Sequence, residues 1–237
     1  MSAKNVEHKF IVPNSVEIRD YQVNLANQAK NENCLIILPT GLGKTVVALH
    51  VIADYLAKGN GGVLFLAPTK VLVNQHYEFL KNTLAIDDIT LITGEDLLEK
   101  RKKLWINSII CATPEITRND IARKIVDINQ FSLIIFDEAH RAVGDYAYVA
   151  IAEQFSGLSI RMLGMTATLP SEKEKAKEIC NNLHIKNLAE RSDSSPDVKP
   201  YIQETSTEWI PVDLSSDMKI IQRYLKLALD QRYTELR

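Results

Sequence analysis

The sequence predicts an α/β fold of three layers, in which a mostly parallel sheet lies between two layers of helices. Short apolar segments rich in β-branched residues alternate with segments, such as 45–58 and 70–84, whose apolar residues recur every three or four positions. Strands this continuously apolar are expected where helices cover both faces of a sheet. The expected strands are 34–38, 62–67, 88–93, 108–112, 132–137 and 160–166.

Ligands of such sheets bind at the carboxyl ends of the strands, and the first expected strand ends in the segment LPTGLGKT at 38–45. This segment follows the phosphate-loop formula G-x-x-x-x-G-K-[ST] except at Leu38, which stands where the formula has glycine. The alternative is a chance match at a helix start. This alternative is less favoured because the segment lies between an expected strand and an expected helix.

Each residue type in this loop suits phosphate binding. Backbone N–H groups and the positive end of a helix attract phosphates, while Gly41 and Gly43 permit a close approach of the backbone. Lys44 is expected to reach the β- and γ-phosphates, and the hydroxyl of Thr45 to bind Mg²⁺. The expected nucleotide-binding residues are Pro39, Thr40, Gly41, Leu42, Gly43, Lys44 and Thr45.

Asp137 and Glu138 follow the fifth expected strand. Transfer of a phosphoryl group to water needs a metal that neutralises charge and a group that positions the water. Asp137 suits the metal, through coordinated waters, and Glu138 suits the water, so the expected catalytic residues are Glu138, Lys44 and Asp137. Two carboxylates at a strand end are often only solvated loop residues. The phosphate loop upstream favours the interpretation that the two segments take part in one reaction.

The phosphate loop and the segment DEAH at 137–140 together resemble the DEAH-type members of helicase superfamily 2. The resemblance implies a RecA-like fold, ATP and Mg²⁺ as cofactors, and Leu38 as a familiar variant of the loop. It also implies that Gln22, with Arg19 beside it, reads the adenine edge. Thr166, Ala167 and Thr168, together with His140, would couple the nucleotide site to the strand-binding surface.

Three further segments resemble those that hold a nucleic-acid backbone in this superfamily. They are Pro68-Thr69-Lys70, Thr93-Gly94 and Thr113-Pro114-Glu115, and each follows an expected strand. Small polar residues and helix N-termini can bind successive phosphates without reading bases. The alternative for each segment is an ordinary helix cap, since threonine before a helix is common.

Three segments carry a narrower resemblance: LPTGLGKT at 38–45, DEAHRA at 137–142 and PDVKPYIQETSTEWIPVDL at 196–214. Through them the sequence looks most like the archaeal Hef helicases and the related Fanconi-anaemia M translocase. That resemblance implies a RecA-like helicase domain at 1–190, and at 191–237 a linker and the start of a helical insertion domain. No Q-x-x-G-R-x-x-R segment of a second RecA-like domain is found. We therefore expect that domain, with its arginine finger, to be absent from this chain and to act as its partner, leaving hydrolysis by the chain alone weak.

The expected function is that of a motor domain of an ATP-dependent helicase or translocase acting on branched DNA in repair. Two alternatives remain open from the sequence. One is a helicase stimulated by double-stranded RNA, because the RNA sensors and Dicer-type helicases share this motif set. The other is a nucleotide- or DNA-binding module without catalysis of its own.

Composition and charge restrict which other classes of function are compatible with the sequence. The net charge of −2 gives no global basic signature, so we expect any nucleic-acid contact to be local or shared with residues not present in this chain. The three cysteines and five histidines show no zinc spacing. No apolar run reaches membrane length and the N-terminus lacks a signal sequence, so we expect a cytoplasmic protein, nucleoid-associated if prokaryotic, with no membrane partner. The charge-rich segments 94–105 and 171–178 are expected to be solvated helices, and Lys100, Arg101, Lys102 and Lys103 a local basic patch.

Overall fold

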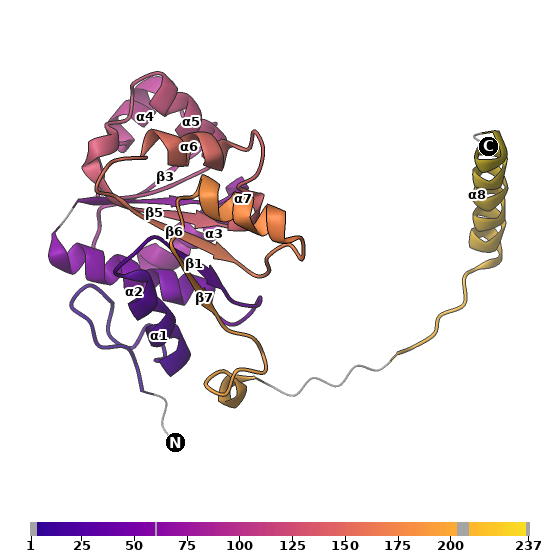
Figure 1. Ribbon diagram of the computed structural model, residues 1–237, viewed down its shortest axis with the longest axis horizontal. Helices are drawn as coiled ribbons and strands as arrows, with labels where there is room; N and C mark the ends of the chain where they lie inside the picture. Colours follow the sequence, from indigo (N-terminus) through magenta and orange to yellow (C-terminus); the bar gives the residue numbers. More distant parts are fainter. Residues whose placement is uncertain (1–3, 60, 203–208, 236–237) are drawn as a thin grey trace. The chain divides into compact units, whose positions relative to one another are not determined.

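The computed structural model describes residues 4–59, 61–202 and 209–235 (Figure 1). The chain divides into two compact units, Met1–Ile202 and Gln203–Arg237. The larger unit contains the sheet, and the smaller one contains a single long helix in its described part. Each unit is considered by itself below.

In the described part of the chain, seven parallel strands form one sheet in the order β3-β4-β2-β5-β6-β1-β7. All six expected strands are confirmed. The seventh, β7, was not predicted because it is a short edge strand in which only Ala189 is buried, so it lacks an apolar run. The strands are β1 Cys34–Ile37, β2 Gly62–Leu66, β3 Ile89–Ile92, β4 Ile109–Ala112, β5 Phe131–Asp137, β6 Arg161–Thr166 and β7 Asn187–Glu190.

Helices cover both faces of the sheet, as the apolar strands predict (Figure 1). Alternate residues of each strand enter one of two cores: in β1, Ile36 packs with helices α1 to α3, and Leu35 with α5 to α7. The helices of this unit are α1 Asp20–Ala29, α2 Lys44–Lys58, α3 Lys70–Thr83, α4 Leu98–Leu104, α5 Pro114–Ala122, α6 Ala147–Gln154 and α7 Lys173–Asn182, with short 3-10 turns η1 Ile128–Gln130, η2 Ala139–Arg141 and η3 Lys199–Tyr201.

Local sequence signals fix the helix ends near the carboxyl edge of the sheet. Helix α3 begins after Thr69, whose hydroxyl oxygen accepts a hydrogen bond from the backbone N–H of Leu72 at 3.3 Å. Helix α5 begins with Pro114, which suits the first turn because its missing N–H has no helical partner there. Helix starts are therefore aligned with strand ends, where the candidate site lies.

The larger unit extends beyond residue 190, where the sequence analysis placed its boundary. Val198 is fully buried in the core, and the ring of Tyr201 packs on Tyr21 with centroids 5.5 Å apart. Arg191 donates to Asp197 at 2.8 Å, which closes the turn between them. Residues 191–202 thus pack on the larger unit, although their polar, proline-containing sequence resembles a linker.

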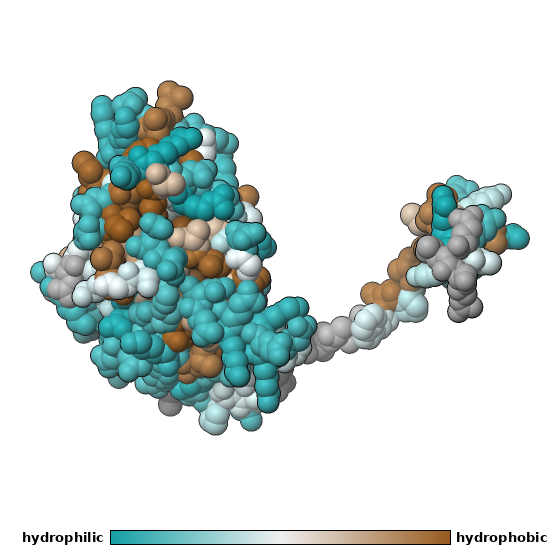
Figure 2. Space-filling model, turned by 45° about the horizontal axis from the view of Figure 1, so that its top comes forward, coloured by the Kyte–Doolittle hydropathy of each residue, from teal (hydrophilic) through white to brown (hydrophobic). Residues whose placement is uncertain are grey.

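The smaller unit contains helix α8, Ser216–Glu235, which confirms the helix expected at the end of the chain. The linker expected within 191–237 falls partly on 203–208, which lie outside the described residues. Figure 2 shows hydrophobic and hydrophilic residues side by side on this unit. The large apolar side chains exposed on α8 are Met218, Ile220, Ile221, Tyr224, Leu225, Leu227, Leu229 and Tyr233. Across residues 4–59, 61–202 and 209–235, no helix is long and apolar enough to cross a membrane.

Candidate functional site

The loop at 38–45 leaves strand β1 in a conformation that requires glycine at two positions. Gly41 and Gly43 have φ angles of 87° and 82°, in the left-handed region. A Cβ atom on Gly43 would lie only 2.5 Å from Nε2 of Gln22. Leu38, at the position where the motif formula has glycine, is fully buried, and its N–H donates to the carbonyl of Thr166 at 3.0 Å. Leu38 therefore belongs to the end of the strand, and the loop turns after it.

Helix α2 begins at this loop with an open N-terminus. Its N-cap is Gly43, which has no side chain to accept hydrogen bonds from the first turn, so the N–H groups of Lys44 and Thr45 receive no side-chain cap. Nζ of Lys44 lies 3.1 Å from the carbonyl oxygen of Leu38, across the loop. The loop thus combines free backbone donors, the positive end of a helix and an ammonium group, which suits phosphate.

The acidic pair lies at the end of strand β5, whose last residue is Asp137, and β6 separates β5 from β1 in the sheet. Asp137 is only 4% exposed, and its backbone carbonyl accepts a hydrogen bond from the hydroxyl of Tyr148 at 2.7 Å. Burial raises the pKa of Tyr148 well above its usual range, so this hydroxyl stays a neutral donor. Glu138 is half-buried and adopts a left-handed conformation with φ 51°, which is uncommon outside glycine and concentrates at functional sites.

His76 joins the acidic pair to the phosphate loop, a relationship that the sequence analysis missed. Nε2 of His76 lies 2.8 Å from Oδ2 of Asp137, and its Nδ1 lies 3.5 Å from Oγ1 of Thr45. The available signal was its position on the buried face of α3, three residues after Val73 and four before Leu80. Apart from His140, which the resemblance to the helicases indicated, the histidines were considered only as zinc ligands. Tyr148 was missed as well, since its contact is with a backbone atom.

The expected coupling residues meet between the two loops. Nδ1 of His140 lies 3.0 Å from Oγ1 of Thr166, and the Thr166 hydroxyl donates to the carbonyl of Thr168 at 2.8 Å. Ala167 lies between these threonines, half-buried. Because β6 pairs with both β1 and β5, Thr166 contacts the phosphate loop through its backbone and the acidic loop through its side chain.

The residues expected to read adenine lie against the phosphate loop. Gln22 is 2% exposed and its Nε2 donates to the carbonyl of Leu42 at 3.0 Å, while its Oε1 is buried with no hydrogen-bond partner in the described structure. Tyr21 donates to the same carbonyl at 2.8 Å, and Nη1 of Arg19 donates to the Tyr21 hydroxyl oxygen at 3.4 Å. The unpaired oxygen of Gln22 is an acceptor suited to an amino group of a base.

The three segments expected to hold a nucleic-acid strand lie side by side, because β3, β4 and β2 are neighbours in the sheet. Thr69, Lys70, Gly94 and Glu115 are exposed, and Pro68 and Thr113 are half-buried. Together these residues outline a polar edge of the sheet.

Two of the residues expected at this edge are buried. The side chain of Thr93 is 6% exposed, and its hydroxyl donates to the carboxylate of Asp96 at 3.4 Å. Pro114 is also buried, because it starts the first turn of α5. Lys70 forms an ion pair with Glu95, which ties the start of α3 to the loop after β3.

Comparison with known proteins identifies the family to which this fold and site belong. A family model described as DEAD/DEAH box helicase matches residues 19–176. The chain belongs to the DEAD/DEAH box helicase family. The matched region begins at Arg19 and includes the phosphate loop, the DEAH segment and Thr166, so the resemblance inferred from the motifs is confirmed.

Two relatives of this helicase domain match nearly its whole length. One is a Methanocaldococcus jannaschii protein whose name describes an ATP-dependent RNA helicase, 40% identical over 96% of this chain. The other is the ATP-dependent DNA helicase fml1 of Schizosaccharomyces pombe, 32% identical over 98% of this chain. The chain spans 29% of the length of each of these relatives.

Solved structures support the RecA-like fold of this helicase domain. The Hef helicase domain of Pyrococcus furiosus is 42% identical and superposes with a TM-score of 0.79, over 87% of this chain and 45% of that one. The helicase MrfA, at 16% identity and a TM-score of 0.61 over 79% of this chain and 32% of that one, shares the fold. The three-layer RecA-like architecture expected from the sequence is therefore confirmed.

The charge-rich segment of the helicase domain at 94–105 differs from expectation. Arg101 is 6% exposed, and its Nε and Nη2 atoms donate to the two carboxylate oxygens of Asp120 at 2.7 and 3.0 Å. Nε1 of Trp105 donates to the same carboxylate at 2.9 Å. Arg101 therefore links α4 to α5 in the interior. It does not contribute to the basic surface patch that was expected at 100–103.

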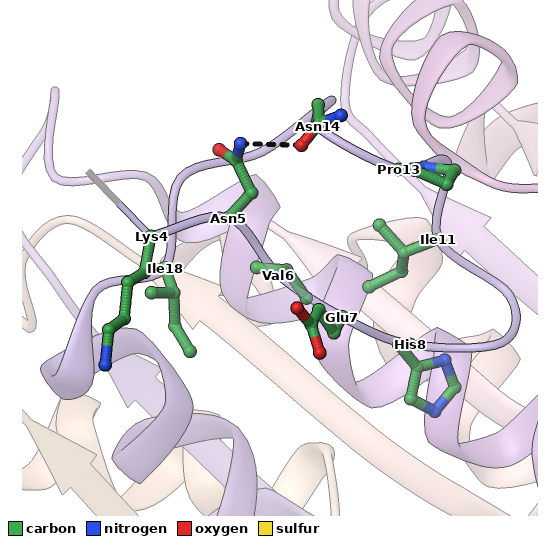
Figure 3. A pocket seen from close by; sticks show the side chains of 9 residues that line it. All are labelled: Lys4, Asn5, Val6, Glu7, His8, Ile11, Pro13, Asn14 and Ile18. Atoms are coloured by element: carbon green, nitrogen blue, oxygen red, sulfur yellow. Dashed lines mark hydrogen bonds between the residues drawn. The ribbon is translucent and has the colours of Figure 1, made fainter. Parts of the chain in front are cut away.

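A surface pocket of the helicase domain lies beneath the segment 4–18 (Figure 3). Its lining includes Lys4 and His8, which lie at opposite ends of it, and the apolar side chains of Val6 and Ile11. Nδ2 of Asn5 donates to Oδ1 of Asn14 at 2.9 Å, which closes the loop around the pocket. Its polar side chains are spread along the loop and none is a member of a helicase motif, so we place the functional site at the carboxyl edge of the sheet.

Proposed function

We propose that this chain is the ATP-binding motor domain of an ATP-dependent DNA helicase or translocase that acts on branched DNA in repair. The observation that carries the proposal is the common sheet edge of the phosphate loop, the acidic pair and three strand-contact segments. Relatives named ATP-dependent DNA helicases, including fml1 and Fancm of Drosophila melanogaster, support the DNA substrate. The second RecA-like domain of the complete protein is the proposed partner across the nucleotide.

The loop and the acidic residues fit ATP with Mg²⁺. Among the described residues, no group of three or more His, Cys, Asp or Glu side chains is placed to hold a metal ion. Mg²⁺ is commonly bound by one or two protein oxygens together with phosphate oxygens and water, and Thr45 and Asp137 would provide such ligands. When bound, the metal neutralises charge on the phosphate oxygens.

The chain's own residues then have separate roles. Lys44 and the N–H groups at the start of α2 hold the β- and γ-phosphates, and Gln22 receives the base. Glu138, with its side chain 29% exposed at the end of β5, is accessible to water and orients the attacking molecule. His140 and Thr166 couple conformational changes at the nucleotide site to the strand-binding edge. Hydrolysis is completed by an arginine finger of the second domain, so the chain alone hydrolyses ATP weakly.

An RNA substrate is the second candidate, since the Methanocaldococcus jannaschii relative is named as an RNA helicase. The proposed contacts are to the backbone, and these do not by themselves separate the two nucleic acids. A protein distinguishes them through the 2′-hydroxyl and the shape of the duplex.

The test is the ATP hydrolysis rate of the complete protein with forked DNA, linear duplex DNA of the same sequence, and duplex RNA. We expect forked DNA to stimulate hydrolysis most. Stronger stimulation by duplex RNA would replace the DNA proposal with the RNA one. No stimulation by any of the three would favour a binding module without catalysis.

A further inference from the structure

His76 contacts two residues of the proposed metal site, although no helicase motif assigned above includes it. Its imidazole lies in the interior, 9% exposed, between Asp137 at 2.8 Å and Thr45 at 3.5 Å. The first residue comes from the end of β5 and the second from the first turn of α2, while His76 itself comes from α3. One side chain therefore connects three elements at the point where the nucleotide phosphates would lie.

The two contacts determine which imidazole nitrogen carries hydrogen in the neutral ring. A carboxylate only accepts hydrogen bonds, so Nε2 carries the hydrogen that Asp137 accepts. Nδ1 is then an acceptor, and the hydroxyl of Thr45 donates to it in the longer and weaker contact. This arrangement turns the hydrogen of Thr45 toward His76 and leaves the lone pairs of its oxygen free for a metal ligand role.

Packing alone does not explain a histidine at this position. His76 lies on the same face of α3 as Val73 and Leu80, and its ring packs against Phe65 with centroids 4.6 Å apart. An apolar side chain would satisfy these neighbours, whereas a buried imidazole is unfavourable unless its nitrogens are paired. Both of its nitrogens face side chains that the proposed metal site uses.

We propose that His76 is a positioning residue, which orients the carboxylate of Asp137 and the hydroxyl of Thr45 together for the metal that accompanies ATP. This inference rests on the proposed function, because it concerns the same metal site. Side chains that orient metal ligands through hydrogen bonds typically change metal affinity by about 10- to 100-fold. His76 therefore affects nucleotide binding mainly when Mg²⁺ is present.

The experiment compares two substitutions of His76 in the 237-residue chain. His76→Phe keeps a ring against Phe65 and removes both nitrogens, while His76→Gln keeps one donor for Asp137 and one acceptor for Thr45. Gln75→Ala, at the exposed neighbouring position on α3, is the matched control. The affinity for a fluorescent ADP analogue is measured for each protein in Mg²⁺ and in EDTA, with the melting temperature recorded alongside.

We expect His76→Phe to weaken binding in Mg²⁺ by about tenfold and to leave binding in EDTA unchanged. His76→Gln should recover most of the loss, and Gln75→Ala should match the wild type. An unchanged Mg²⁺ dependence in His76→Phe, or an equal loss in both substitutions, overturns the role of His76. A wild type whose ADP affinity does not depend on Mg²⁺ overturns the metal site itself, and with it the inference.

A measurement on the unsubstituted chain covers the case in which His76→Phe fails to fold. Nitrogen-15 NMR of the imidazole should show hydrogen on Nε2 and a bare Nδ1, and the Nδ1 resonance should shift when ADP is added with Mg²⁺. Hydrogen on Nδ1 of the neutral ring, or an Nδ1 resonance insensitive to Mg²⁺, contradicts the positioning role.

Discussion

Nδ1 of His140 lies 3.0 Å from Oγ1 of Thr166, so the acidic loop after β5 and the end of β6 are directly joined. The backbone carbonyl of Thr166 also accepts the N–H of Leu38 at 3.0 Å, at the start of the phosphate loop. Thr166 is fully buried and contacts both halves of the proposed nucleotide site. We therefore expect a shift of either loop to act on this same residue.

Thr166→Val tests this link, because valine keeps the branched shape and removes the hydroxyl. The hydroxyl bonds to His140 and to the carbonyl of Thr168, and each lost bond corresponds to about 1 kcal/mol. We therefore expect the forked DNA unwound per ATP hydrolysed to fall severalfold while nucleotide affinity stays unchanged. The complete protein is assayed for both quantities. Thr83→Val is the control, since the Thr83 hydroxyl donates to the carbonyl of Phe79 at the end of α3 and Thr83 belongs to none of the expected motifs. A ratio equal to that of the wild type contradicts the coupling role.

Glu138→Gln separates binding from hydrolysis. Glutamine has the same shape and can occupy the same backbone conformation, but it does not accept a proton from water. We expect nucleotide affinity within a factor of about two of the wild type and hydrolysis by the complete protein reduced by roughly 100-fold or more. Preserved hydrolysis would remove Glu138 from its proposed role.

Gly43→Ala and Gly41→Ala form a matched pair in the phosphate loop. Both positions have positive φ, but an added Cβ meets Nε2 of Gln22 at 2.5 Å only at Gly43, while Gly41 has open space. Each alanine should destabilise the loop by about 1–2 kcal/mol through its backbone. Gly43→Ala should in addition weaken ATP-analogue binding, because Gln22 must move.

Adding Gln22→Ala to Gly43→Ala checks the source of that additional effect. The melting temperature of the double variant should lie closer to that of Gly41→Ala than the melting temperature of Gly43→Ala does. Equal melting temperatures and nucleotide affinities for Gly41→Ala and Gly43→Ala would show that the approach of Gln22 does not matter.

Arg101→Met tests the buried ion pair that replaced the expected basic patch. Removing one partner leaves the carboxylate of Asp120 buried without its charge partner, so the free energy of unfolding should fall by about 3–5 kcal/mol. Lys102→Met, at the exposed pair with Glu99 on the same helix, should change it by less than about 1 kcal/mol. Urea denaturation measures both, and similar effects of the two substitutions would contradict the assignment.

The sequence was sufficient for the elements whose residues are strongly patterned. The six apolar strands, the phosphate loop and the acidic pair were all expected where the structure has them, since burial on both faces of a parallel sheet requires continuous apolar runs. Strand β7 was not predicted because this edge strand buries only one side chain, Ala189, and so has no apolar run. The packing of segment 191–202 was not predicted because Val198 and Tyr201 pack against neighbours that are distant in the sequence.

The contacts of single charged side chains needed the structure. Arg101 lies in the run KRKK, which predicts a solvated face, yet its partner Asp120 lies on a different helix. His76 similarly gains its role from Thr45 and Asp137, which are far from it in the sequence. A pattern along the chain predicts which face of an element is buried, but not which distant side chain meets a polar residue on that face.

The most direct test of the central claim is a calorimetric titration of the chain with a non-hydrolysable ATP analogue in Mg²⁺. The wild type should bind at one site, and Lys44→Ala, which removes the ammonium group from the loop, should lose binding by tenfold or more, or about 1.4 kcal/mol. Lys58→Ala, at the far end of the same helix, should bind as the wild type does. Binding by Lys44→Ala with wild-type affinity would contradict the assignment of this loop as the ATP site.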